Sequence, residues 1–142
     1  MKKNILSSII SLLILSGVKE NANAQTWQWA NSAGGNANDN GYAITTDSNG
    51  NVFVTGYFNS PTITFGSTIL TNAGSDDIFV VKYDASGNVL WAKSAGGISG
   101  DAGYGISTDA GGNVFVTGLF NSPTITFGST TLTTAGDRKS VV

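Results

Sequence analysis

The stretch NVFVTGYFNSPTITFGST at residues 51–68 decides the fold, because it returns at residues 113–130 as NVFVTGLFNSPTITFGST. The two copies lie 62 residues apart, and the alignment extends without a gap over residues 29–74 and 91–136. Of those 46 aligned positions, 34 are identical. Self-similarity over such a length is the signature of a tandem repeat, in which each period forms one structural unit.

Short runs rich in β-branched and aromatic residues fill each period, and such runs predict strands. In the first period they are residues 42–46, 51–58, 63–71 around Gly66, 78–83 and 88–93. The tetrapeptides Asp-Ser-Asn-Gly and Asp-Ala-Ser-Gly separate two pairs of these runs. Because Asp hydrogen-bonds to the backbone of a turn and Gly adopts positive φ, both tetrapeptides predict hairpin loops.

Large side chains occur at both odd and even positions of these runs. Val52 and Val54 fall on one face of a predicted strand, and Phe53 and Tyr57 fall on the other. A sheet with one wet face would alternate apolar with polar residues. We therefore expect sheets covered on both faces, as in a propeller, which repeats a four-stranded blade every ~40–60 residues. The predicted fold is all-β, with antiparallel β-propeller-type blades in tandem repeats of 62 residues and an incomplete ring.

Two longer segments carry a family resemblance: DNGYAITTDSNGNVFVTGYF at residues 39–58 and SDDIFVVKYDASGNVLWAKSAGG at residues 75–97. In these two segments the sequence resembles the SBBP family of bacterial β-propeller repeats, which occur in secreted and cell-surface proteins. The resemblance covers essentially all of the chain between the N-terminal leader and Gly136. It implies a propeller-like architecture and an extracellular setting, and it implies no catalytic residue.

The N-terminus has the three regions of a secretory signal peptide. Lys2 and Lys3 precede the apolar residues 5–18, and residues 22–24 form an A-x-A cleavage motif. The apolar run is short for a membrane helix, which needs about 20 residues. We therefore expect cleavage after Ala24, a secreted or cell-surface product, and no stable membrane span after cleavage.

The phase of the repeat divides the chain into unequal parts. Residues 1–24 are the predicted signal peptide, 25–38 match the final strand of a repeat, 39–97 form a complete propeller-like repeat, and 98–136 form a partial second repeat. A propeller needs about 4–8 blades, so we expect a truncated fragment of a longer protein. Such a fragment would expose an unpaired blade edge, and we expect it to be poorly stable or to self-associate through that edge.

Residues 137–142 (DRKSVV) depart from the repeat, which predicts a copy of residues 75–80 at this place. One interpretation is a capping segment, because terminal repeats are often atypical. We prefer a second one, in which the tail is non-native. A common sequencing-library adapter, GATCGGAAGAGCGTCGTGTAG, translates as Asp-Arg-Lys-Ser-Val-Val followed by a stop, so the tail matches adapter read-through.

Composition excludes several classes of function. Only 11% of the residues are charged and the net charge is −2, so the chain lacks the clustered Lys and Arg of a nucleic-acid-binding protein. It contains no His and no Cys, which removes Ser-His-Asp triads, Cys nucleophiles, disulfides and the usual zinc sites.

Carboxylates are the remaining candidates for catalysis. The acids between the leader and the tail are Asp39, Asp47, Asp76, Asp77, Asp84, Asp101 and Asp109. A retaining glycosidase needs two carboxylates about 5–5.5 Å apart, whereas Asp76 and Asp77 are neighbours and would point to opposite faces of a strand. Asp39 and Asp101 hold equivalent positions after Gly-Gly pairs, so we interpret them as structural.

Calcium binding is the next alternative, because residues 47–51 and 84–88 faintly resemble acidic calcium loops. An EF-hand loop needs a Glu at its twelfth position, where this chain has Phe58 and Ala95. We therefore prefer turn chemistry for both loops. The Gly-Gly pairs at 34–35 and 96–97 lack the Gly-Lys-Ser/Thr of a phosphate-binding loop.

The three tryptophans could stack on sugars, but packing is the simpler role. Trp29 and Trp91 are equivalent positions of the repeat, and Trp27 aligns with Val89, which suggests a place in the core. The two copies differ most in the loops at residues 36–40 and 98–102. We expect residues that determine binding specificity to lie in these loops.

These observations predict a secreted or cell-surface β-propeller repeat protein with a non-catalytic interaction or structural role. We expect it not to be an enzyme and to have no catalytic, cofactor-binding or metal site, and its ligand-binding residues are not identifiable from the sequence. The expected partner is an extracellular protein or a glycan, not a nucleic acid. The alternative is a fragment of an extracellular carbohydrate-active propeller enzyme.

Overall fold

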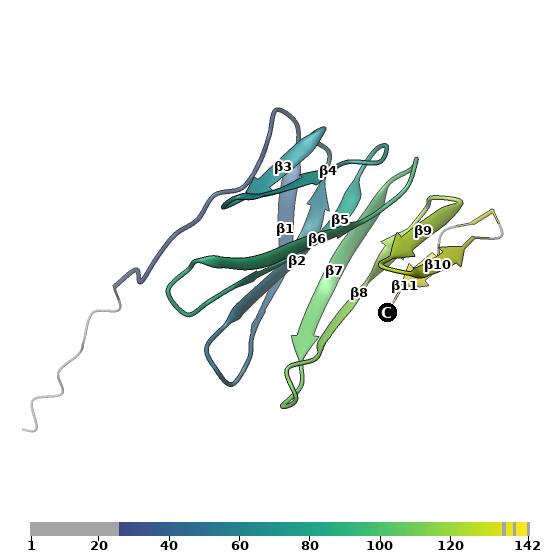
Figure 1. Cartoon of the computed structure of the whole chain (residues 1–142). Coiled ribbons are helices and arrows are strands. Elements are labelled where there is room, and N and C mark those ends of the chain that lie inside the picture. Colours follow the sequence, from purple (N-terminus) through teal and green to yellow (C-terminus); the bar gives the residue numbers. More distant parts are fainter. Residues whose placement is uncertain (1–25, 135, 138, 142) are drawn as a thin grey trace, which may run out of the picture.

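A computed structural model describes residues 26–134, 136–137 and 139–141. The predicted signal peptide at residues 1–24 lies outside these residues. The described residues form eleven strands and no helix, so they contain no helix that could cross a membrane (Figure 1). The strands are β1 (Asp39–Thr46), β2 (Val52–Phe58), β3 (Thr62–Phe65), β4 (Thr68–Thr71), β5 (Asp77–Tyr83), β6 (Val89–Ala95), β7 (Asp101–Thr108), β8 (Val114–Phe120), β9 (Thr124–Phe127), β10 (Thr130–Thr133) and β11 (Lys139–Val141).

Two blades follow one another along the chain. Blade 1 is a four-stranded antiparallel sheet in the order β1-β2-β5-β6, with the hairpin β3-β4 inserted between its second and third strands. Blade 2 repeats the plan with β7, β8 and β11 in one sheet and the hairpin β9-β10 beside it. The predicted all-β fold of antiparallel propeller-type blades is confirmed, and the described residues form no closed ring.

The hairpin loops have the geometry that their sequence predicts. The Asp47 carboxylate accepts hydrogen bonds from the backbone N–H groups of Asn49 and Asn51 at 2.9 and 3.0 Å and from the Asn51 side chain at 2.7 Å. Gly50 closes the loop with φ of 78°, a conformation that other residues avoid. The Asp84 and Asp109 loops repeat this arrangement.

The core of blade 1 lies between its sheet and the inserted hairpin. Ile63 of β3 and Leu70 of β4 pack on Phe58, Phe79 and Val81 of the sheet, all of them buried. Both faces of the sheet are covered, because Phe53 on the opposite face is also buried. This result agrees with the large side chains at both odd and even positions of β2.

The blades stack so that a residue of one repeat touches its own copy in the next. The rings of Tyr42 and Tyr104, 62 residues apart, lie 5.2 Å from each other. The Thr108 hydroxyl donates to the backbone carbonyl of Thr46, also 62 residues away, at 2.9 Å. The first strands of the two blades, β1 and β7, therefore lie side by side, as the inner strands of a propeller do.

Residues 26–38, which match the final strand of a repeat, form no strand in this structure. They nevertheless contact blade 1 much as the end of β6 and the loop after it contact blade 2. Ala37 N–H donates to the Ser60 hydroxyl at 3.0 Å, and Ser99 N–H donates to the equivalent Ser122 hydroxyl at 3.0 Å. The Trp29 ring packs on Tyr83 at 5.4 Å.

The described part of the tail forms a strand. Its residues Lys139–Val141 form β11, which pairs with β8 at the place that β5 takes in blade 1. The register is the same, because Lys139 opposes Phe120 as Asp77 opposes Phe58. Strand pairing uses backbone groups that every residue carries except for the N–H of proline, so the altered sequence of the tail does not prevent it.

Blade stacking predicts different costs for the same substitution at two equivalent glycines. A Cβ at buried Gly103 would overlap the Thr55 hydroxyl, which the Phe79 carbonyl holds at 2.8 Å, whereas a Cβ at exposed Gly41 would meet only ordinary contacts. We expect Gly103→Ala to lower the free energy of unfolding by about 1–3 kcal/mol. Gly41→Ala should change it by less than about 0.5 kcal/mol, and urea unfolding of both variants measures the difference. Equal effects of the two substitutions would contradict the stacking.

Candidate functional site

A polar pocket of about 260 Å³ lies where the inner strands of the two blades meet. Three tyrosines, two carboxylates and part of the variable loop at residues 98–102 surround it. We call it the tyrosine pocket, and its lining residues are Tyr42, Tyr57, Asp76, Gly100, Asp101, Ala102, Tyr104, Leu119 and Asn121.

The aromatic wall of the pocket is built by β1, β2 and β7. Tyr42 lies in the middle, with its ring 5.5 Å from that of Tyr57 and 5.2 Å from that of Tyr104. Tyr42 and Tyr104 remain about half exposed, at 49% and 50%. The Tyr57 hydroxyl is held by the Asn40 side chain, which donates to it at 2.7 Å. The row therefore presents exposed aromatic surface on a rigid sheet.

Asp101 at the floor of the pocket is structural. It is fully buried and accepts from the backbone N–H groups of Asn121 and Ser122, at 2.9 and 3.1 Å, and from the Ser122 hydroxyl at 2.7 Å. The equivalent Asp39 accepts the corresponding bonds from Asn59 and Ser60. Burial raises the pKa of Asp39, but hydrogen bonds from Ser60, Gly35 and Asn59 outweigh burial and hold it below its ordinary value.

Asp76 and Asp77 have separate environments, although they are adjacent. Asp76 lines the pocket and accepts from the Asn59 side chain at 2.8 Å. Asp77 is 2% exposed, and its Oδ2 accepts from Ala73 N–H at 2.8 Å, whereas its buried Oδ1 has no hydrogen-bond partner among the described residues. Burial, with repulsion from Asp101 and Asp76, raises the pKa of Asp77 to about 6.

The remaining candidate acids serve the hairpin loops. Asp47, Asp84 and Asp109 each use both carboxylate oxygens on donors of their own loop. Hydrogen bonds from the loop Asn side chain lower the pKa of each of these carboxyl groups. No group of three or more His, Cys, Asp or Glu within the described ranges is arranged to hold a metal ion.

The tryptophans divide between packing and exposure. Trp29 packs on the core of blade 1, and Trp91 lies edge-on to Phe53 with ring centroids 6.1 Å apart. Trp27 is 93% exposed, so its alignment with Val89 wrongly suggested a core position. The reason is that residues 26–38 form no strand here and pair with no sheet that would cover the ring.

Sequence reasoning missed the tyrosine row. The available signal was Gly-Tyr at 41–42 returning at 103–104 beside a polar variable loop. That pattern does not reveal that Tyr57, from another strand and without a copy in the second repeat, completes the wall.

Asp77 makes stability depend on pH in an unusual direction. Its pKa is about 6 in the folded chain and about 3.9 when unfolded. The folded state then binds the extra proton between these values, so stability falls as pH rises from about 4 to 6. We expect Asp77→Asn to unfold with about 1–2 kcal/mol more free energy than the parent chain at pH 8 and with a flatter profile between pH 4 and 6.

Urea unfolding at several pH values measures this effect. Asp84→Asn is the control with the opposite sign, because loop hydrogen bonds lower the pKa of Asp84. An Asp77→Asn variant that is less stable than the parent chain at pH 8 would contradict the burial of a charged carboxylate.

Comparison with known proteins agrees with this architecture. Residues 29–61 match the family model described as SBBP, a beta-propeller repeat. The chain is also 33% identical, over 129 residues, to an uncharacterized WD repeat-containing protein of Acanthamoeba polyphaga mimivirus. That alignment covers 87% of this chain and 9% of the relative, so the chain spans a small part of the length of that protein. The repeated blades and the stacking of equivalent residues, together with the family match over residues 29–61, show that the chain is built of β-propeller-type repeats.

Proposed function

We propose that the chain is a non-catalytic interaction module of a secreted or cell-surface β-propeller repeat protein, and that the tyrosine pocket receives a cationic side chain of a partner protein. The secreted setting rests on the N-terminal leader of the sequence. The interaction role is supported by the β-propeller repeat match and by the WD repeat relative.

The observation that carries the proposal is the exposed pair Tyr42 and Tyr104 beside the carboxylate of Asp76. Aromatic faces attract ammonium and guanidinium groups, and Arg and Tyr are both enriched at protein interfaces. Because each tyrosine lies on an inner strand that is hydrogen-bonded within its own blade, their positions are fixed before binding. Little conformational entropy is then lost when a partner docks.

The carboxylates that line the tyrosine pocket favour the binding of cations. Asp76 and Asp101 line it, and the described lining includes no Lys or Arg. Loss of solvent contact raises the pKa of Tyr42 most, followed by Tyr57, Tyr104 and the Asp76 charge. Of these neighbours, Asp76 alone carries a negative charge at neutral pH. A Lys or Arg that approaches the pocket would meet attraction from the carboxylates as well as from the rings.

The arrangement of the acids supports the non-catalytic role over the carbohydrate-active enzyme. Asp39 and Asp101 hold the loops that follow β2 and β8, and Asp77 is buried against Gly96. A glycosidase needs one carboxylate free to attack or to activate water and a second positioned to donate a proton. Of the acids near the pocket, Asp76 alone faces it without being nearly fully buried.

Titration of the folded chain with a tetra-lysine peptide tests the proposal. We expect saturable binding that weakens by about tenfold or more in the Tyr42→Ser and Asp76→Asn variants and weakens with added salt. Isothermal calorimetry measures both effects. A tetra-glutamate peptide and a cello-oligosaccharide serve as comparison ligands.

Ile44→Ser is the matched control, because Ile44 is an exposed apolar residue of the same strand and does not line the pocket. It should bind the basic peptide as the parent chain does. Equal binding of the acidic peptide, or binding of the sugar alone, would overturn the cationic partner.

A further inference from the structure

A second polar hollow, of about 280 Å³, lies where three segments of the chain converge at blade 1. They are residues 31–32, the end of β3 with its turn at residues 65–67, and the β5-β6 loop with the strand ends beside it, at residues 83 and 87–89. We call this hollow the turn pocket. It shares no lining residue with the tyrosine pocket.

The three segments of the turn pocket are held against one another. The Asn31 side chain donates to the Gly87 carbonyl at 2.6 Å, and the Trp29 ring lies so close to Gly87 that a Cβ there would overlap it. The β3-β4 turn packs on β6, because a Cβ on Gly66 would lie 3.2 Å from the Val89 side chain. The walls are therefore fixed before a ligand arrives, so little conformational entropy is lost on binding.

The most deeply placed polar group of the turn pocket is a phenol that the fold does not use. Tyr83 lines the pocket and is only 7% exposed. Its hydroxyl forms no hydrogen bond with another described residue. Burial raises the pKa of Tyr83, so the hydroxyl stays protonated and can both donate and accept. Because a buried hydroxyl without a partner is unfavourable, a polar ligand in the pocket would supply what the protein lacks.

Neutral polar groups surround this hydroxyl. Ser32 and Ser67 are exposed, and their hydroxyls form no hydrogen bond with described residues. Asn31 and Asn88 donate within the protein through Nδ2, at 2.6 and 2.9 Å, which leaves their side-chain oxygens as acceptors. The described lining contains no charged residue. The pocket therefore offers several donors and acceptors without a formal charge.

Apolar surface completes the turn pocket. Phe65, which is 3% exposed, and the half-buried Val89 line it beside Tyr83. Apolar side chains with a few convergent polar groups are typical of small-molecule sites, and those for drug-sized ligands measure about 300–1,000 Å³. A pocket just below this range suits a single pyranose ring, whose C–H groups are apolar and whose hydroxyls donate and accept.

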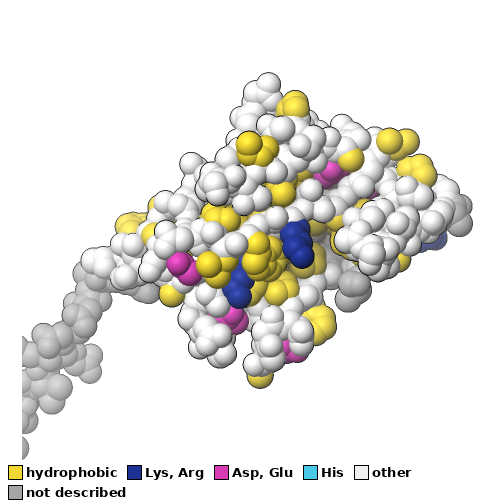
Figure 2. All heavy atoms as spheres, in the orientation of Figure 1, with side chains coloured by type: hydrophobic (Ala, Val, Ile, Leu, Met, Phe, Trp, Pro, Cys, Tyr) yellow, Lys and Arg dark blue, Asp and Glu magenta, His cyan; other side chains and the backbone are white. Residues whose placement is uncertain are grey.

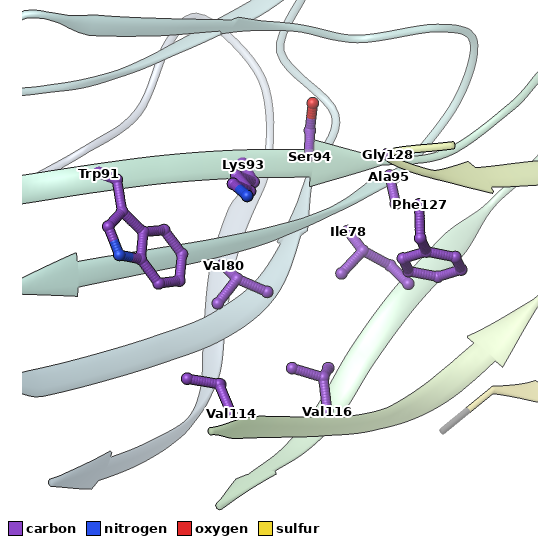
Figure 3. A pocket seen from close by; sticks show the side chains of 10 residues that line it. All are labelled: Ile78, Val80, Trp91, Lys93, Ser94, Ala95, Val114, Val116, Phe127 and Gly128. Atoms are coloured by element: carbon purple, nitrogen blue, oxygen red, sulfur yellow. The ribbon is translucent and has the colours of Figure 1, made fainter. Parts of the chain in front are cut away.

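Equivalent residues elsewhere in the chain include a charge. The apolar groove in Figure 3 is lined by Lys93 and Phe127, which are the copies of Asn31 and Phe65. Figure 2 likewise shows basic side chains beside a hydrophobic area in the middle of the face in view. Asn31 in place of a lysine leaves the turn pocket without a cation, which favours a neutral ligand over an acidic one.

We infer that the turn pocket binds a neutral sugar residue of a glycan. One hydroxyl of the sugar bonds to the Tyr83 hydroxyl, others bond to Ser67 and to the Asn31 side-chain oxygen, and the ring packs on Phe65 and Val89. This site is separate from the tyrosine pocket, and the inference does not rest on the proposed function.

Titration of the full chain with the methyl glycosides of glucose, galactose, mannose and N-acetylglucosamine tests the inference. We expect saturable binding of at least one of them, with shifts of the amide signals of residues 66, 67, 87 and 88 in heteronuclear NMR spectra. The amino-sugar and uronic-acid forms of the bound sugar should bind at least about threefold more weakly, because the lining offers no opposite charge to compensate for lost water.

Variants of the chain locate the site. Tyr83→Phe removes only the hydroxyl, so it should weaken binding by about three- to tenfold and leave the urea midpoint unchanged or raised. Ser67→Ala, on the exposed rim, should also weaken binding. Ser86→Ala is its matched control, because Ser86 is an exposed serine of the β5-β6 loop that does not line the pocket. Trp27→Ala tests whether the sugar stacks on the exposed indole instead, and this variant should bind as the parent chain does.

The inference is overturned if none of the four glycosides shows saturable binding. Binding that Tyr83→Phe and Ser67→Ala leave unchanged, or that Trp27→Ala abolishes, would place the sugar elsewhere and overturn it as well. Should Tyr83→Phe fail to fold, Ser67→Ala decides alone, because its side chain is exposed. Equal affinity for the neutral and the charged sugars would contradict the requirement for a neutral ligand.

Discussion

The structure depends on a hydrogen-bonded carboxylate at the start of each inner strand, which is half-buried in Asp39 and fully buried in Asp101. Asp101 orders the loop after β8 by accepting three hydrogen bonds from Asn121 and Ser122. Ser122 in turn accepts from Ser99 N–H, in the segment that leads from blade 1 into blade 2. A buried charge is tolerated only when hydrogen bonds compensate for lost water, so this arrangement fixes the loop, the inner strand and the blade junction together. The same set of contacts around Asp39 fixes blade 1 against residues 26–38.

This junction explains where the exposed surface of the proposed binding site arises. The carboxylates that hold the loops cannot also serve as free acids, because their oxygens already accept hydrogen bonds. The three pocket tyrosines and Asp76 lie on the surface around these carboxylates. The junction holds them in position, and they remain accessible to a partner. The proposed interaction role requires side chains that are held in place before the partner arrives, and the sheet supplies such support.

Much of the fold was predictable because repetition, strand alternation and turn chemistry act locally. The 62-residue period identified the blades, and the Asp-x-x-Gly loops form the predicted hairpins. The pairing of β11 was not predictable from side chains, because the ladder with β8 uses backbone groups. The exposure of Trp27 was missed for the opposite reason, since its burial requires a sheet that residues 26–38 do not join. The tyrosine pocket was missed because it combines side chains from three strands, and spacing along one strand does not report contacts across blades.

Contacts between equivalent residues, such as Tyr42 with Tyr104, have an evolutionary consequence. When the unit is duplicated, a side chain at such a position becomes its own neighbour. Aromatic rings tolerate this self-contact, whereas a lysine or aspartate would face a like charge at every new junction. Gene duplication can therefore lengthen the array in a single step, because each added copy brings a complementary surface for the copy before it.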